Sequence, residues 1–321
     1  MRDEAEHKAD SEAVEVGARR CRDAEGVSAA SPERRLLATG SVRRRKRKSR
    51  MVEVVAVLSS ALAVGVLALV VLTVLFKALP ALNLDLFTKT EATFGESGGG
   101  IAHAFVGSML LVGIAAAMAL PIGVLIAIYV SEFAGPRTAM LVRSSLDVLN
   151  GIPSIVIGIA VFSLLVLRFH QNAFIASIAL AIIMLPLISR ATQEVLALVP
   201  QSLREASQAL GVSKWRTVLR VVLPTILGGI VTGATLAVAR AAGETAPLLF
   251  TTSIFLNAVV TDPSQAMATL PFTIFVYSEA PDPHLNDQAW AAAFILMAFV
   301  LVTSLLARFL LSRSERKLKG R

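Results

Sequence analysis

Apolar, uncharged runs separated by short charged segments occupy most of the chain after residue 50. Charged side chains, and His103 at the start of the second, bound six of these runs, whose interiors are 54–76, 104–131, 148–167, 169–189, 221–239 and 288–307. A bilayer core about 30 Å thick needs roughly 20 helical residues, and lipid forces backbone polar groups to bond within the segment. The runs show no strand-like alternation. They predict an all-α integral membrane protein with six transmembrane helices.

The number of spans follows from the distribution of basic residues. A seventh apolar stretch, 245–261, is a weaker candidate because it contains Pro247 and several hydroxyl and amide side chains. A basic block at 43–48 precedes the first run, and the last residues, 309–321, are also basic. Basic flanks prefer the cytoplasmic side of a membrane. Both termini are therefore expected in the cytoplasm, which requires an even number of spans and favours six over seven.

The composition agrees with a membrane protein. Of the 321 residues, 55% are hydrophobic and 17% are charged, with a mean hydropathy of +0.68 and a formal net charge of +8. A soluble domain carries about a quarter charged residues. The single cysteine, Cys21, excludes a disulfide framework and a cysteine-based metal cluster. The four histidines leave little for a metal site, so no metal ligands are predicted.

Four regions follow from the pattern of charge and hydropathy. We expect a disordered basic cytoplasmic tail at 1–50, the first transmembrane helix and an outer loop at 51–100, a transmembrane core at 101–308, and a basic cytoplasmic tail at 309–321. The start of the chain mixes both charge signs without a sustained apolar face, which is typical of disorder. The basic block adjoins a span and therefore suits contact with anionic membrane lipid. No nucleic-acid partner is expected.

The chain lacks the motifs of an enzyme. The triplet Gly98-Gly99-Gly100 lacks the spacing of a phosphate-binding loop, and no Walker A motif occurs in the sequence. No nucleophile–base pair and no HExxH motif supports hydrolysis within the membrane. No catalytic residue is therefore predicted. A chain of this kind that moves a solute uphill needs a partner that supplies the energy.

The inner loop at 200–224 carries the most informative soluble pattern. Pro200 is followed by Ser202 and Glu205 at the spacing of a capping box, which predicts a short helix over 203–210 that ends at Gly211. A second amphipathic helix over 213–222 then returns to the membrane. The apolar residues of this loop suit either insertion into a groove of another protein or contact with the inner leaflet: Leu203, Ala206, Leu210 and Trp215.

The third apolar run contains residues that disturb a transmembrane helix. Gly151, Pro153 and Gly158 lie within nine consecutive residues, 150–158. Small residues permit close packing between helices, or a local bend. The functional interpretation is a broken helix beside a solute route, because broken helices line cavities in transporters. Both interpretations are open from the residues alone.

Arg240 and Glu244 are the charged residues at membrane depth that most directly suggest a functional site. They are four residues apart and share one face of a continuous helix. Ionisable groups in a membrane face a cavity or a partner, and a guanidinium fork suits a tetrahedral oxyanion. Glu244 would then hold the arginine or accept a proton from the ligand. One alternative is an ion pair without solute contact. Another is that Gly243 and Pro247 end the helix and place Glu244 at the outer surface.

Other charged residues are expected at the cytoplasmic face. Arg143 and Asp147 are four residues apart and are predicted to pair at the entrance of the third span. Glu132 is expected at the membrane interface. Arg190 and Glu194 are expected to begin the inner loop.

Residues 205–224 resemble the EAA coupling loop of type I ABC importer permeases. The family pattern is Glu-Ala-Ala, three residues, Gly, nine residues, and then Ile-x-Leu-Pro. This chain has Glu205-Ala206-Ser207, Gly211 and Val221-Val222-Leu223-Pro224 at the same spacing, with Ser in place of the second Ala and Val in place of Ile. The resemblance implies that the loop docks into a cleft on a cytoplasmic ATPase. Glu205, Ala206 and Gly211 match the family's coupling positions.

Two further segments resemble phosphate importer permeases. Residues 150–158, NGIPSIVIG, are similar to a segment shared by these permeases, and residues 240–249, RAAGETAPLL, are similar to a signature of the PstA type. The outer-loop residues 268–271 and 289–291 also resemble that type. The resemblance implies that Arg240 and Glu244 match charged positions implicated in phosphate passage. It covers about residues 101–308 and leaves the N-terminal tail outside.

The resemblance implies a permease subunit of an ATP-driven, binding-protein-dependent importer of inorganic phosphate in the inner membrane of a bacterium. Its expected partners are a PstC-like permease subunit, a PstB-like ATPase dimer that binds ATP and Mg²⁺, and a PstS-like phosphate-binding protein. The chain itself is expected to bind no cofactor. A permease for sulfate or molybdate would keep the transporter class and change the cargo. An ion-coupled secondary carrier is a different class and would leave the coupling pattern unexplained.

Overall fold

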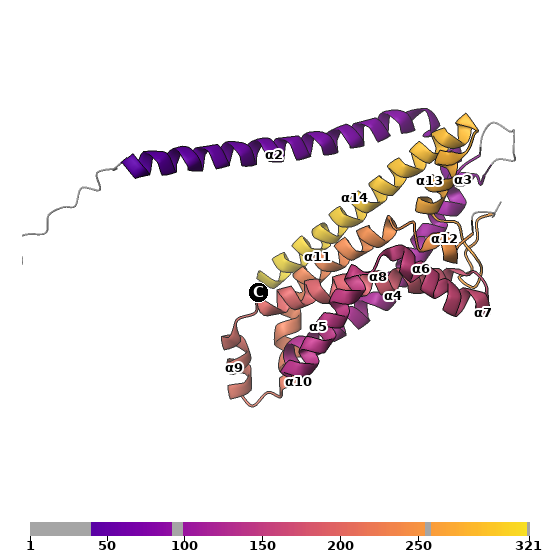
Figure 1. The fold of residues 1–321 in the computed structure, drawn as a ribbon. Helices are drawn as coiled ribbons and strands as arrows, with labels where there is room; N and C mark the ends of the chain where they lie inside the picture. The colour runs from indigo at the N-terminus through magenta and orange to yellow at the C-terminus, as the bar shows by residue number, and fades with distance from the viewer. Residues whose placement is uncertain (1–39, 92–98, 254–257, 320–321) are drawn as a thin grey trace, which may run out of the picture. The chain divides into compact units, whose positions relative to one another are not determined.

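The structure is a computed structural model that describes residues 40–91, 99–253 and 258–319, with side chains for 44–91, 99–253 and 258–309. Over these residues the fold is helical, without a strand (Figure 1). The longer helices are α2 (Gly40–Ala78), α4 (Ala102–Ile128), α5 (Pro136–Gly151), α6 (Ser154–Val161), α8 (Ala173–Ala197), α9 (Gln201–Ala209), α11 (Leu223–Ala242), α13 (Leu270–Glu279) and α14 (Pro283–Lys319).

Short helical segments connect the longer helices. Three are π-helical turns: η2 (Tyr129–Phe133), η3 (Phe162–Val166) and η4 (Val218–Val222). The others are η1 (Leu79–Ala81), α3 (Asp85–Thr88), α7 (Leu167–Phe169), α10 (Lys214–Thr217) and α12 (Leu248–Thr251). Because η2 directly follows α4 and η4 directly precedes α11, both longer helices contain a widened turn at the end that meets the inner loop.

The chain divides into two compact units, residues 1–67 and 68–321. The first contains most of α2, which has exposed apolar side chains such as Val52, Leu62 and Leu69. A helix that is apolar all round suits lipid. Most of the tail expected to be disordered lies outside the described residues, but residues 40–50 are helical, contrary to that expectation. Lys and Arg have high helix propensities, so the basic block continues the helix of the span.

Five described helices are long and apolar enough to cross a membrane: Arg44–Ala81, Ala102–Phe133, Ala173–Ala197, Lys214–Ala242 and Pro283–Phe309. The third expected span is a bent pair, Pro136–Gly151 and Ser154–Phe169, whose axes differ by 96°. Counted as one span, this pair brings the total to six, which confirms the predicted all-helical six-span fold. The stretch 245–261 contains only the four-residue helix α12 among its described residues, and it adds no seventh span.

The bend between α5 and α6 has a local cause. Ile152 has φ −71° and ψ 130°, which is an extended conformation. The residue before a proline is disfavoured in the helical region because its backbone and Cβ clash with the proline ring. Pro153 therefore ends α5 after Gly151 and becomes the residue that precedes α6. A Cβ added at Gly151 would meet no atom within 4 Å, so this glycine marks the end of a helix and not a close packing contact.

Helix α8 is the central element of the larger unit and packs against α4, α5, α6, α11 and α12. Its buried residues Leu180, Met184 and Ile188 share a core with α4 and α11. Helices α11 and α8 are in close contact at Gly233. A Cβ added at this position would lie 2.5 Å from the Cβ of Ala191. Helix α14 packs against α11 and α13.

The two ends of the larger unit have different structures. Figure 1 shows α9 and α10 at one end and α12 and α13 at the opposite end. At the α13 end, the Ser108 hydroxyl in α4 accepts a 2.7 Å hydrogen bond from the backbone N–H of Leu270. This bond ties the beginning of α13 to the beginning of α4. At the α9 end, the polypeptide leaves α8 and returns to α11 through the inner loop.

Candidate functional site

The inner loop forms the short helix that the sequence predicts, with small differences at its start. Helix α9 spans Gln201–Ala209, and its N-cap residue is Pro200 with no side-chain cap hydrogen bond. The predicted capping box of Ser202 and Glu205 is therefore wrong, because the helix begins before Ser202 and leaves it in the first turn. At the other end, Gly211 has φ +75°. This left-handed conformation is the one expected for a glycine that follows a helix.

One side of α9 faces the protein and the other is exposed. Ser207 is buried, and its hydroxyl lies 2.9 Å from the Thr217 hydroxyl of α10. The departure from the family's second alanine therefore adds a hydrogen bond between the two arms of the loop. Glu205 and Ala206 are exposed, and so are Leu203 and Leu210, the latter by 83%. The positions carried over from the EAA pattern are thus accessible to a partner.

Arg204 lies on the inward side of α9 and contacts two other elements, η2 and the end of α8. Its guanidinium donates hydrogen bonds of 2.8 and 3.1 Å to one carboxylate oxygen of Glu132, in η2. It also donates to the carbonyl oxygens of Leu196 and Val199, at the end of α8, over 3.0 and 2.8 Å. The two charged side chains are 17% and 7% exposed. The sequence places Glu132 and the inner loop that carries Arg204 near the cytoplasmic face, but nothing in it indicates that the two residues pair.

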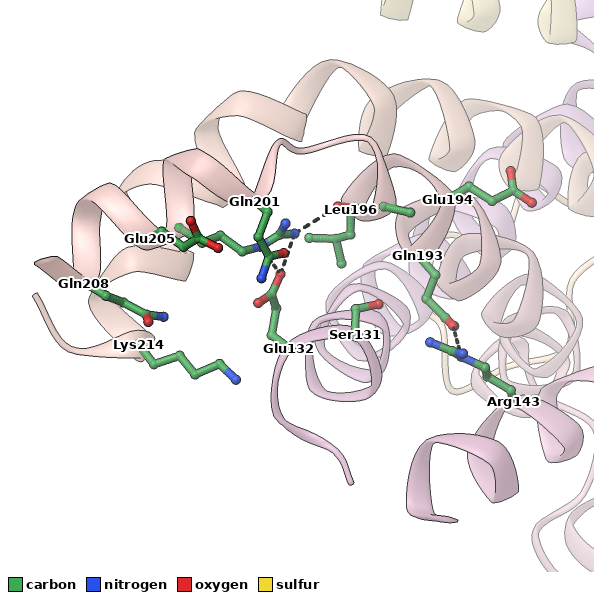
Figure 2. Close-up of a pocket in the computed structure, with 12 residues that line it drawn as sticks. Ser131, Glu132, Arg143, Gln193, Glu194, Leu196, Gln201, Glu205, Gln208 and Lys214 are labelled. Carbon is green, nitrogen blue, oxygen red and sulfur yellow. Dashed lines mark hydrogen bonds and ion pairs between the residues drawn. The ribbon is translucent and has the colours of Figure 1, made fainter. Parts of the chain in front are cut away.

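A pocket of about 660 Å³ adjoins this contact. Figure 2 shows Glu132, Glu205, Gln208 and Lys214 around its α9 side, while Arg143 lies farther along and bonds to Gln193. The pocket carries charges of both signs: Glu132, Glu194, Glu205, Arg143, Arg204 and Lys214. Mixed charge of this kind does not select a small anion.

The predicted pair of Arg143 and Asp147 does not form. Asp147 instead pairs with Arg190 of α8, and Arg143 Nε donates a 3.2 Å hydrogen bond to the Gln193 side chain. Both contacts join α5 to α8, because helix α8 extends to Ala197 and brings its own polar residues beside α5. Arg190 and Glu194 therefore belong to α8 and do not begin the inner loop. Packing between helices overrides the pairing within one helix.

Arg240 and Glu244 lie at the end of α11 that is remote from the inner loop. Helix α11 ends at Ala242, yet the Nε of Arg240 and the Oε1 of Glu244 are 3.5 Å apart. The Arg240 side chain is 52% exposed, and that of Glu244 is 15% exposed. The helix therefore stops before Glu244, as one of the sequence alternatives expected. The carboxylate nevertheless turns back toward the arginine and is largely covered.

Gly158 contacts the segment that follows this pair. A Cβ at position 158 would lie 2.6 Å from the Cα of Pro247 and 3.2 Å from the ring of Phe250. Helix α6 therefore packs closely on α12 through Gly158. The structure thus brings the glycine of the broken span against the segment that carries Glu244. It places Gly151 and Pro153 at the 96° bend.

The titratable groups at the α13 end include one carboxyl group whose pKa is shifted. Burial raises the pKa of Glu91 above its ordinary value of 4.5, and the nearby Tyr277 hydroxyl opposes the shift in part. Burial, together with the charge of Glu91, raises the pKa of Tyr277. Among the residues that the structure describes, no group of three or more His, Cys, Asp and Glu side chains is placed to hold a metal ion.

A family model and individual relatives both match transport-system permeases. The model of the binding-protein-dependent transport system inner membrane component matches residues 119–319. The phosphate transport system permease protein PstA of Haemophilus influenzae is 39% identical over 243 residues, which are 74% of this chain and 85% of the relative. PstA 1 of Mycobacterium tuberculosis strain H37Rv is 40% identical over 227 residues, 68% of this chain and 72% of the relative.

Solved structures show the same fold at lower sequence identity. A bacterial alginate ABC transporter matches with a TM-score of 0.59 and 13% identity, over 85% of this chain and 97% of its own. The inward-facing MetNI methionine ABC transporter matches with a TM-score of 0.53 and 19% identity, over 67% of this chain and 94% of its own. The chain belongs to the binding-protein-dependent transport system inner membrane components and, within them, to the PstA family of phosphate transport system permeases.

Proposed function

We propose that this chain is the transmembrane permease subunit of an ATP-driven, binding-protein-dependent importer of inorganic phosphate. The observation that carries the proposal is its 39% identity with a PstA protein over 85% of that protein's length. The identity extends over most of the described spans and the inner loop. The chain forms part of the transport pathway and is not an enzyme.

The inner loop is the proposed contact with the ATPase. Helix α9 exposes Glu205 and Ala206, and Gly211 turns the chain sharply enough to leave this helix projecting at one end of the larger unit (Figure 1). An exposed short helix with apolar residues beside charges suits a groove on another protein. The proposed partner is a PstB-like ATPase dimer, which binds the ATP and Mg²⁺. This chain binds neither.

The end of α11 is the proposed part of the phosphate pathway. Arg240 offers a planar set of donors that suits two oxygens of a phosphate group. Glu244 lies 3.5 Å from it, holds the guanidinium in place, and can take up a proton from the bound anion. The bend at Gly151 and Pro153 lets α6 move relative to α5 as access to the pathway alternates, and the close contact of Gly158 with Pro247 passes that movement to α12.

The remaining partners follow from the transport cycle. A PstC-like permease subunit completes the membrane portion, a PstS-like protein delivers phosphate from outside, and lipid surrounds the apolar helices. Both termini lie in the cytoplasm, because the basic block and the basic C-terminal residues favour that side and α9 must reach the ATPase. The protein is a multi-pass protein of the bacterial inner membrane.

A different oxyanion is the second candidate cargo. A guanidinium fork also binds sulfate or molybdate, so the arginine alone does not select phosphate. Glu244 provides the distinction, since a protonated phosphate can donate a hydrogen bond to a carboxylate and a fully ionised sulfate cannot. An ion-coupled secondary carrier would leave the exposed α9 without a use.

Complementation tests the proposed function. Cells that lack this chain are supplied with the wild-type gene, and uptake of phosphate and of sulfate is measured at low external concentrations with equal membrane abundance. We expect the wild-type chain to restore phosphate uptake and to leave sulfate uptake unchanged. Restoration of sulfate uptake alone would retain the importer and reject phosphate. Uptake that needs no ATPase would reject the importer class.

A further inference from the structure

Arg204 stands out because its side chain reaches from α9 to the ends of two other helices, α4 and α8. Helix α9 packs mainly on α10 and η4, which lead into α11 as one span, Lys214–Ala242. This packing connects α9 to the span of α11. Arg204 adds a second connection, to η2 and to the end of α8.

The contact is built to hold a fixed geometry. Arg204 places three guanidinium nitrogens on three acceptors, which are the Glu132 carboxylate and the carbonyl oxygens of Leu196 and Val199. The last carbonyl groups of a helix lack partners within that helix, and a positive charge at this end is favourable. A planar guanidinium that satisfies several acceptors is fixed in direction as well as in distance.

Burial makes the pair depend on both members. The side chains of Arg204 and Glu132 are 17% and 7% exposed. Removing one member of a buried ion pair leaves an uncompensated charge, which is more costly than the loss of an exposed pair. The position of α9 relative to η2 is therefore strongly determined by these two residues.

The next residue of η2 supports the other arm of the loop. The Phe133 ring lies 5.8 Å from the Trp215 ring of α10, and the Lys214 ammonium lies 5.3 Å from the same phenylalanine ring. Glu132 and Phe133 therefore contact α9 and α10, respectively. The end of α4 receives both arms of the inner loop.

We propose that Arg204, through its buried contact with Glu132 and the end of α8, is the positioning residue that converts displacement of α9 into movement of α4 and α8. This inference rests on the proposed docking of α9 to an ATPase. Arg204 is directed toward η2 and the end of α8, while Glu205 and Ala206 are exposed, so docking and transmission use different residues of one helix. Because α8 packs against α4, α5, α6, α11 and α12, movement at its end reaches the core of the larger unit.

The test measures coupling in the assembled transporter. The complex is purified with its ATPase and reconstituted into lipid vesicles, and the number of anions moved per ATP hydrolysed is determined for wild type, Arg204→Gln, Arg204→Lys and Glu132→Gln. The matched control is Arg143→Gln, which removes the same charge from the same pocket, but Arg143 donates its hydrogen bond to Gln193 of α8 and not to α9. Retention of the ATPase during purification is quantified for every variant.

We expect Arg204→Gln and Glu132→Gln to retain the ATPase and to hydrolyse ATP, while anions moved per ATP fall by roughly tenfold or more. Arg204→Lys should be intermediate, because one ammonium cannot serve the three acceptors in one plane. The control should stay within about twofold of wild type, as exposed contacts contribute little. Glu132→Gln preserves the size of the side chain and keeps the test decisive if Arg204→Gln fails to assemble.

An unchanged ratio in both Glu132→Gln and Arg204→Lys would overturn the inference. So would loss of the ATPase in parallel with transport, since the pair would then serve to present the docking surface and not to pass on its movement. The ratio is measured with whichever anion the wild-type complex accumulates, phosphate or sulfate. The wrong cargo would therefore refute the proposed function and leave this test intact.

Discussion

Gly158 and Pro247 meet so closely that a single added carbon would lie 2.6 Å from the Cα of the proline. The two residues belong to the second half of the bent span and to the segment that follows Glu244. This contact couples the broken helix to the charged end of α11. A larger residue at position 158 is therefore the simplest change that disturbs the charged end of α11 without altering a charge.

Gly158→Ala is expected to lower phosphate uptake and thermal stability, because the contacted atom is backbone and α6 or α12 must shift. Overpacking costs about 1–3 kcal/mol. The melting temperature of the solubilised protein and uptake at equal abundance check this expectation. Gly113→Ala is the matched control, since a Cβ at position 113 meets nothing within 4 Å. Equal behaviour of the two variants would contradict the close contact.

Substitutions at Gly211 should follow backbone conformation. The residue has φ +75° and open space around it, so strain and not a clash determines the cost, about 1–2 kcal/mol for an ordinary L residue. Asn visits this region more readily than Val. We expect co-purification of the ATPase to decrease in the order Gly, Asn, Val at position 211. Equal loss in both variants would mean that any side chain is excluded by the docking surface.

Position 207, where this chain has serine in place of the alanine of the EAA pattern, should tolerate a return to alanine but not a larger residue. Ser207→Ala restores the family's residue and loses one hydrogen bond to Thr217, at a net cost of roughly 0.5–1.5 kcal/mol. Transport should persist near the wild-type level. Ser207→Leu places a large side chain in a buried position and should release α9 from α10, with loss of uptake. Normal uptake by the leucine variant would show that α9 does not pack on α10 in the working transporter.

Cysteine labelling tests the position of the charged pair. In a Cys21→Ser background, a cysteine at position 240 should react faster than one at position 244, because the side chains at these positions are 52% and 15% exposed. A membrane-impermeant maleimide applied to intact cells makes the comparison. Faster reaction at position 244 would place Glu244 at an open outer surface.

Glu91 should make the stability of the α13 end depend on pH. Burial raises the pKa of this carboxyl group above 4.5, so the folded state favours its neutral form. The resulting stabilisation is present below pH 4.5 and is lost as pH rises through the folded-state pKa. In Glu91→Gln this component should be absent. Melting temperatures of both proteins between pH 4 and pH 7 test the sign, and convergence of the two proteins at high pH, with divergence at low pH, would contradict it.

Local patterns were sufficient to predict the helices and the loop. Six apolar runs mark the spans, and a glycine at position 211 correctly marks the left-handed end of α9. Errors arose where a local rule competed with another. The capping-box spacing of Ser202 and Glu205 was outweighed by Pro200, which starts the helix earlier. The helix propensity of Lys and Arg carries α2 back to Gly40, although the composition of the tail suggested disorder.

Pairings between distant residues could not be predicted in this way. Arg143 and Asp147 have ideal helical spacing, yet Asp147 pairs with Arg190 on another helix. Arg204 and Glu132 are 72 residues apart, and nothing in either segment indicates the other. Such contacts depend on how α4, α5 and α8 pack against one another, and the local pattern of residues in each helix does not reveal that packing. The 96° bend has a visible cause in Pro153, but its angle is set by the same packing.

Transport by the reconstituted complex tests the central claim most directly. The chain is purified with its permease partner and ATPase, placed in vesicles with accessible ATP sites, and supplied with the phosphate-loaded binding protein and radiolabelled phosphate. We predict that the wild-type complex moves phosphate in an ATP-dependent manner and does not move sulfate. Arg240→Gln should reduce the rate of phosphate movement at least tenfold. Wild-type vesicles that hydrolyse ATP and move sulfate but not phosphate would contradict the account.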